Sequence, residues 1–222
     1  MRWPSRWRWW LVPITGGCVA WASVSVLAVF TDSAAVGANT FTTGTWGCTS
    51  PGSTTFVATA DAWIDEANAT QNNGGTNPLN VQSRNGARNR RAIVRFPLPV
   101  SVPAGCSVTV ATLRLYASSS AGTRTIDVYR AAAAWNETTV TWNTRPATTG
   151  TAVGSASLGA AGWQTWTVTA QVAAQFPAAN NNGFVIRDRT ESQSSTAQQQ
   201  VYRSREAGGT PANRPELIVT FG

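Results

Sequence analysis

Short alternating runs separated by turn residues fill the chain from about residue 54 onward. Ten such runs occur, and they are rich in the β-branched, aromatic and alternating apolar residues that favour strands. The separators contain Gly, Asn and Pro, as in QNNGGTNP and AGGTPANRP. Many short strands with turn signals between them are typical of an antiparallel β-sandwich or jelly roll. The sequence therefore predicts one all-β domain over residues 54–222.

Two segments depart from the strand pattern. The segment Thr169–Phe176, TAQVAAQF, predicts a short helix with Thr169 as its cap and Val172 and Phe176 on one face. The span Thr148–Ala161 is rich in Gly, Ala and Thr, and it predicts either a weak edge strand or a loop.

Residues 1–38 have the layout of a signal peptide or membrane anchor. Basic Arg2, Arg6 and Arg8 precede an uncharged run of 22 residues, Trp9–Phe30. Small residues permit cleavage after Ala28 or after Ala38. The alternative is an uncut anchor, because the run is long enough to cross a bilayer core of ~30 Å. A lipoprotein site at Cys18 is disfavoured by Thr15.

Export determines how the remaining cysteines are interpreted. Residues 39–53 are rich in Gly, Ser and Thr and predict a loose lead-in to the domain. Beyond the export segment only Cys48 and Cys106 remain, and an even pair in an oxidising compartment predicts a disulfide. We expect this pair to be structural, and we expect the protein to be secreted or held at the cell surface.

The basic residues exclude several classes of catalysis. All 17 are arginine, with no lysine or histidine, and the net charge is +7. Histidine triads, histidine-bound zinc or copper, Schiff bases and P-loops are therefore excluded. A carboxylate pair is the hydrolytic mechanism that remains. Its nearest candidates are Asp65 with Glu66, Asp188 with Glu191, and Glu206, and none has supporting spacing. We expect a protein that is not an enzyme.

The same arginines indicate the kind of partner. No concentrated basic tract is present, so we expect no nucleic-acid partner. A guanidinium group binds carboxylates through a flat fork of donors, which favours an anionic extracellular or cell-wall polysaccharide. Biased arginine usage in the genome is the alternative explanation.

Several segments carry a family resemblance. These include RNRRAIVRFPL, ATLRLYA, GFVIRD and, as the most specific, WNETTVTWNTRP from Trp135 to Pro146. From about Thr54 to Gly222 the chain resembles the DNRLRE domain, also classed as carbohydrate-binding module family 96. This resemblance implies a β-sandwich that attaches to polysaccharides, including uronate-rich ones. Separately, Ala28–Thr45 resembles the secretion segment of camelysin and biofilm-matrix proteins, which would favour cleavage after Ala28.

Exposed aromatic rings are the first candidate ligand contacts. Six tryptophans lie outside the signal: Trp46, Trp63, Trp135, Trp142, Trp163 and Trp166. Most are expected in the core, because Trp142 shares a register with Val140 and Trp135 opens a turn. Trp63 and Trp163 lie at strand boundaries, which makes them the better candidates for exposure and sugar stacking.

Strand alternation also predicts an arginine face. Ala92, Val94 and Phe96 share one side of a strand while Ile93 and Arg95 take the other, and similar alternation sets Leu113 and Leu115 against Arg114 and Tyr116. If the strands are neighbours, one face collects the ligand-binding candidates Arg95, Arg114, Tyr116, Arg187, Arg203 and Arg205. The equal alternative is a structural ladder neutralised by Asp127, Asp188, Glu137 or Glu206.

Calcium is the one cofactor that the sequence suggests. Asp61 and Asp65 lie four residues apart beside the turn-forming NNGG, and carboxylates are ligands that Ca²⁺ favours. We expect no other cofactor.

The leading functional hypothesis is a non-catalytic module that binds polysaccharide, with an anionic polymer of the uronate type as the candidate ligand. A self-associating extracellular matrix or adhesion protein is the first alternative. A carboxylate-dependent glycosidase or lyase is the second.

Overall fold

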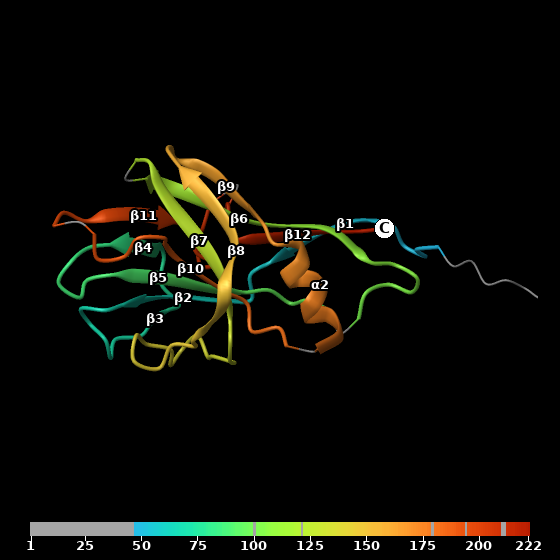
Figure 1. The fold of residues 1–222 in the computed structure, drawn as a ribbon, viewed down its shortest axis with the longest axis horizontal. Coiled ribbons are helices and arrows are strands. Elements are labelled where there is room, and N and C mark those ends of the chain that lie inside the picture. Colours follow the sequence, from blue (N-terminus) through green and yellow to red (C-terminus); the bar gives the residue numbers. More distant parts are fainter. Residues whose placement is uncertain (1–46, 100, 121, 179, 194, 210–211) are drawn as a thin grey trace, which may run out of the picture. The chain divides into compact units, whose positions relative to one another are not determined.

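Antiparallel strands make up most of the described chain. The computed structural model describes residues 47–222 apart from 100, 121, 179, 194 and 210–211. Figure 1 shows the strands wrapped around a shared interior. Their bounds are β1 Gly52–Val57, β2 Ala60–Asp65, β3 Asn73–Gly74, β4 Leu79–Ser83, β5 Arg90–Arg95, β6 Val108–Ser120, β7 Arg124–Ala131, β8 Thr148–Leu158, β9 Gly162–Thr167, β10 Phe184–Asp188, β11 Gln198–Tyr202 and β12 Glu216–Phe221.

The pairing of the strands produces a curled sheet. The order is β1-β12-β6-β11-β4-β5-β10-β7-β8, with β9 paired to β6, β2 paired to β5, and β3 paired to β2. The long β6 pairs with β12, β9 and β11, and the register shifts where β11 meets it at Val201 and Tyr202. Such irregularities bend strands and increase their twist. The curled network encloses a core, as predicted for an all-β sandwich of the jelly-roll type.

The main core follows the predicted alternation. Ala92 and Val94 of β5 are fully buried in it together with Leu113 and Leu115 of β6. Ile93 is also fully buried, but it belongs to a second apolar cluster. Both sides of β5 are therefore covered, because successive side chains of a strand point to opposite faces.

A loop closes the second cluster. This tryptophan loop, residues 132–147, connects β7 to β8 and buries Trp135, Val140 and Trp142 against Ile93 and Ala62. The indole of Trp135 donates a hydrogen bond of 2.8 Å to the carbonyl of Asn182. Trp135 and Trp142 are thus core residues, as the sequence predicted.

Glycine at position 74 permits the loop to approach the sheet. A Cβ atom at Gly74 would lie 1.9 Å from the carbonyl oxygen of Glu137. That separation is far below van der Waals contact, so any larger residue would displace the loop.

Arginines line the space beneath the tryptophan loop. The guanidinium of Arg91 lies 4.7 Å from the centre of the Trp142 ring and donates two hydrogen bonds, of 2.8 and 2.7 Å, to Glu191. Arg187 lies 4.3 Å from the centre of the Tyr129 ring and 3.6 Å from the same carboxylate. Glu191 therefore serves two arginines that come from neighbouring strands.

The two segments outside the strand pattern are both ordered. Helix α2 spans Thr169–Ala178, and Val172 and Phe176 are buried in the main core as expected. The hydroxyl of Thr169 accepts a hydrogen bond from the backbone N–H of Ala111, which fixes the start of the helix to β6. The span from Thr148 forms strand β8, at the edge of the sheet beside β7.

A disulfide joins Cys48 to Cys106, in agreement with the sequence prediction. The residues Trp46–Gly222 form one compact unit. In the part of the chain that the structure describes, no helix is both long and apolar enough to span a membrane. The predicted signal or anchor at residues 1–38 and the secretion segment Ala28–Thr45 lie outside the described residues, and they stay predictions.

Replacing both Cys48 and Cys106 by Ser should lower the free energy of unfolding by about 4 kcal/mol, because the bridge closes a loop between residues 58 positions apart. Guanidinium denaturation monitored by tryptophan fluorescence measures this loss. A reductant should destabilise the wild-type protein and leave the double variant unchanged. Equal stability of the two proteins would contradict a structural role.

Replacing Arg91 by Gln should lower the free energy of unfolding by about 2–3 kcal/mol, because Glu191 would lose its bidentate partner in a largely buried place. Urea denaturation gives the value. The matched control is Arg88→Gln, because the Arg88 side chain is exposed and should be replaceable within about 0.5 kcal/mol.

Candidate functional site

An exposed aromatic surface lies on the outer side of β6 and β9. In the register of these strands Tyr116 is opposite Trp163, and Arg114 is opposite Thr165. Their neighbours Leu115 and Trp166 point the other way and are buried in the main core. We call the surface formed by Arg114, Tyr116, Trp163, Arg203 and Arg214 the Trp163 face.

The aromatic rings of this face are held by one another and by arginine. Trp163 is 36% exposed, and its ring centre lies 5.6 Å from that of Tyr116 in an edge-to-face arrangement. The guanidinium of Arg114 lies 4.2 Å from the Trp163 ring centre, and that of Arg203 lies 5.7 Å from the Tyr116 ring centre. A large exposed ring with fixed orientation is the feature on which a pyranose can stack.

Two of the arginines carry charges that no carboxylate neutralises. Arg114 is paired, because its Nε lies 2.6 Å from Oε2 of Glu216 on β12. Arg203 and Arg214 instead donate long hydrogen bonds of 3.4 Å to backbone carbonyls, those of Gly208 and Ala207. Over the described residues, neither has a carboxylate at ion-pair distance. Their donors are therefore available to a ligand.

Trp163 borders two open hollows. One is a groove whose lining includes Val57, Arg114, Asn213 and Arg214. The other is lined by residues of β8 and β9 and by the turn between them, and it shares only Trp163 with the groove. The indole ring thus lies between two depressions, an arrangement that can accommodate a chain of sugar units rather than a single one.

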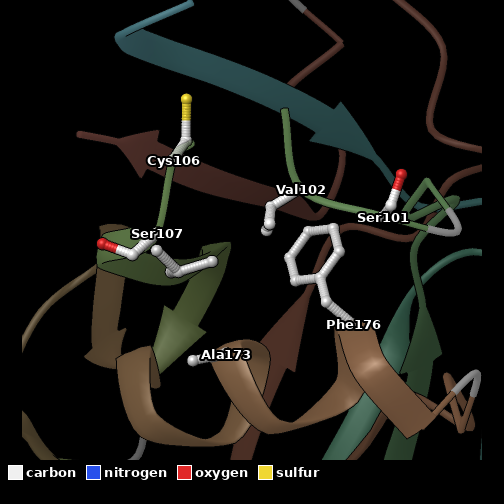
Figure 2. Close-up of a pocket in the computed structure, with 7 residues that line it drawn as sticks. Ser101, Val102, Cys106, Ser107, Ala173 and Phe176 are labelled. Atoms are coloured by element: carbon white, nitrogen blue, oxygen red, sulfur yellow. The ribbon is translucent and has the colours of Figure 1, made fainter. Parts of the chain in front are cut away.

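A third pocket has a different chemistry. It lies between the start of β6 and helix α2, beside the disulfide, and its lining includes Val102, Cys106, Ala173 and Phe176 (Figure 2). Figure 2 shows the Phe176 ring and Val102 close to each other at this pocket. The lining is mainly apolar and contains no charged side chain. It therefore offers little to a polar ligand.

The structure distributes the predicted arginines over three sets of contacts. Arg114 and Arg203 belong to the Trp163 face. Arg95 and Arg187 lie beneath the tryptophan loop, where Arg95 donates to the carbonyl of Trp135. Arg205 binds Glu137 and Glu206. The expected single face does not form, because β11 and β4 separate β6 from β5 in the sheet.

The alternative of a neutralised ladder holds for part of the chain. Asp127 and Asp188 do pair with arginines, but with Arg189 and Arg124 respectively. Among the described arginines of the predicted face, only Arg205 binds carboxylates expected to neutralise it, and these are Glu137 and Glu206.

The other tryptophans differ in how far they are buried. Trp63 is half-buried against the main core, donates a hydrogen bond to the hydroxyl of Thr76, and is covered by Arg90 at 5.0 Å. Trp166 is fully buried, and Trp46 lies outside the described residues. Trp163 is thus the tryptophan that the described domain exposes most.

Sequence reasoning missed Arg214 and Glu216. Arg214 lies in a segment with the composition of a turn between strands, and Glu216 is the first residue of a strand whose other residues are mainly apolar. Alternation in ELIVTF places Glu216 on the outward side, since Leu217 and Val219 are buried. Only the pairing of β12 with β6, more than a hundred residues apart in sequence, brings Glu216 to Arg114.

Three carboxylates that are not part of the Trp163 face gather into a cluster. Asp61, Glu137 and Glu206 each place an oxygen within 4.8 Å of the others. Arg205 donates two hydrogen bonds of 2.7 Å to Glu137, and its backbone N–H donates one of 2.7 Å to Asp61. The pKa of the Asp61 carboxyl is raised to about 8, because burial and the neighbouring Glu206 and Glu137 raise it by more than the N–H of Arg205 lowers it.

Asp65 is not a member of this group. Its carboxylate accepts hydrogen bonds from the backbone N–H of Ala67, the amide of Asn68 and the guanidinium of Arg90. Asp61 and Asp65, the two predicted calcium ligands, therefore lie in different sets of contacts, and calcium binding stays a prediction.

A family model matches most of the chain. No curated protein matches the chain. Residues 52–221 match carbohydrate-binding module family 96, and this range contains every strand, helix α2 and the Trp163 face. The resemblance carried by the sequence motifs agrees with this match. The chain therefore belongs to carbohydrate-binding module family 96.

Proposed function

We propose that the Trp163 face is the surface through which this module binds an extracellular or cell-wall polysaccharide. The observation that carries the proposal is the exposed indole of Trp163, flanked by guanidinium groups and bordered by two hollows. Aromatic rings present a large apolar area at small entropic cost, and the surrounding donors supply direction. A pyranose unit stacks on the indole while its neighbours extend into the hollows.

The charge of the face favours an anionic polymer, of the uronate type. Arg203 and Arg214 lack carboxylate partners among the described residues. Guanidinium donors bind carboxylates in a bidentate geometry, and a repeating anionic chain engages several of them in succession. Arg114 contributes less, because Glu216 already neutralises it.

We propose further that the protein works outside the cell and without catalysis. The disulfide between Cys48 and Cys106 suits an oxidising compartment, and the family is one of binding modules. A self-associating matrix protein remains the alternative, and it would sediment without added glycan. A glycosidase or lyase would release reducing sugars or unsaturated products, and both assays should give no turnover.

Replacing Trp163 by Ala should weaken polysaccharide binding about tenfold or more, because the face loses its stacking ring at the centre of the contact. Affinity gel electrophoresis measures the change, and circular dichroism verifies the fold. The matched control is Trp63→Phe, since Trp63 is half-buried and covered by Arg90. Unchanged affinity in the Trp163 variant would place the binding surface elsewhere.

Replacing both Arg203 and Arg214 by Gln should weaken binding to a uronic polymer about tenfold and change binding to a neutral one far less. Raising the salt concentration from about 0.05 to 0.5 M should narrow the difference in affinity for the uronic polymer between wild type and variant, because salt screens exposed charges. Arg187→Gln serves as control: its guanidinium is held by Tyr129 and Glu191, so stability should fall while affinity stays. Salt-independent binding to both polymers would rule out the anionic preference.

A further inference from the structure

A buried carboxylate oxygen without a partner lies inside the Asp61 cluster. Asp61 is completely buried, and its Oδ1 accepts no hydrogen bond, whereas Oδ2 accepts one from the N–H of Arg205. Burying an acceptor without a donor costs free energy, because the oxygen loses its hydrogen bonds to water and gains none from the protein. Asp61 Oδ1 is therefore a buried acceptor to which none of the described residues donates.

Glu206 has the same deficiency. Both of its carboxylate oxygens are buried and accept no hydrogen bond, although the Arg205 Nε atom lies 2.9 Å from Oε1. Arg205 directs its fork at Glu137, at 2.7 Å for each of the two bonds, so its contact with Glu206 is an ion pair without a hydrogen bond. The guanidinium of Arg205 thus serves two carboxylates, Asp61 is held by a backbone N–H, and the cluster is left with an excess of negative charge when its acids are ionised.

The dimensions of the cluster fit one cation. The oxygens that Asp61, Glu137 and Glu206 offer all lie within 4.8 Å of one another. Two ligands on opposite sides of a Ca²⁺ ion lie about 5 Å apart, since each Ca–O bond is about 2.4 Å long. The donor set consists only of oxygen, which suits a hard cation, and Ca²⁺ tolerates an irregular arrangement better than Mg²⁺ does.

We propose that Asp61, Glu137 and Glu206 bind a Ca²⁺ ion. Asp61 Oδ1 and the carboxylate of Glu206 are the principal ligands, because none of these oxygens accepts a hydrogen bond, and Glu137 completes the group while it holds Arg205. The site joins three segments: β2, the tryptophan loop and the turn that follows Arg203. It is independent of the polysaccharide proposal, because none of its ligands belongs to the Trp163 face.

The test is calcium titration of the full chain after removal of cations with a chelator. Isothermal calorimetry should detect binding at one site. Thermal unfolding should show Tm rising by about 3–10 °C at about 10 mM Ca²⁺, if the dissociation constant lies in the range of about 0.1–1 mM known for extracellular modules. Mg²⁺ at the same concentration should produce a smaller rise.

Variants separate this site from a general effect of calcium. Glu206→Gln should abolish the heat of binding and the Tm response, and Asp61→Asn should do the same. If Asp61→Asn fails to fold, Glu206→Gln decides, because the Glu206 side chain is partly exposed and less critical to packing. The matched control is Asp65→Asn, which removes a buried carboxylate on the same strand and should retain the full response to Ca²⁺.

Three results would overturn the proposal. The first is the absence of heat and of any Tm shift with Ca²⁺ in the wild-type protein. The second is a response that persists in both Glu206→Gln and Asp61→Asn. The third is a response to Mg²⁺ larger than that to Ca²⁺, which would reject calcium as the occupant.

Discussion

A guanidinium group lying over an aromatic ring is the contact on which both sides of this sandwich depend. Seven such pairs occur among the described residues, and they involve tryptophans and tyrosines on β2, β6, β7, β9 and the tryptophan loop. The interaction is attractive because the ring face carries partial negative charge, and it strengthens where water is excluded. With no lysine or histidine, the chain relies on arginine for every cation of this kind.

Whether a loop covers such a pair decides whether the pair belongs to the buried part of the structure. Beneath the tryptophan loop, Arg91 lies over the Trp142 ring and forms an ion pair with Glu191, so its charge is satisfied within the protein. On the Trp163 face Arg114 lies over Trp163 in the same way, but no loop covers this pair and Trp163 remains exposed. One interaction therefore supports a buried layer on one side of the molecule and leaves a surface ready for a ligand on another.

This difference explains which features could be predicted from the sequence and which could not. Strand alternation is local, so it correctly placed Ala92 and Val94 against Ile93. Helical spacing and the count of cysteines likewise sufficed to predict helix α2 and the disulfide. Arg95 and Arg114 look alike in their strands, yet one lies against the carbonyl of Trp135 and the other beside an exposed ring. Their separation depends on the order of strands in the sheet and on where a connecting loop folds back. Neither property is encoded within a single strand, and the cluster of Asp61, Glu137 and Glu206 likewise depends on segments far apart in the chain.

The pairing of β1 with β12 fixes the direction in which the module presents its surface. Gly52 is opposite Phe221 at one end of this strand pair, and Val57 is opposite Glu216 at the other. The first end is where β1 begins and β12 finishes, whereas Val57 and Glu216 line the groove beside Trp163. Six residues of extended strand, about 17 Å from first to last, separate the two ends. The groove is therefore formed at the end of the strand pair that is remote from Gly52 and Phe221, and neither of these residues contributes to its lining.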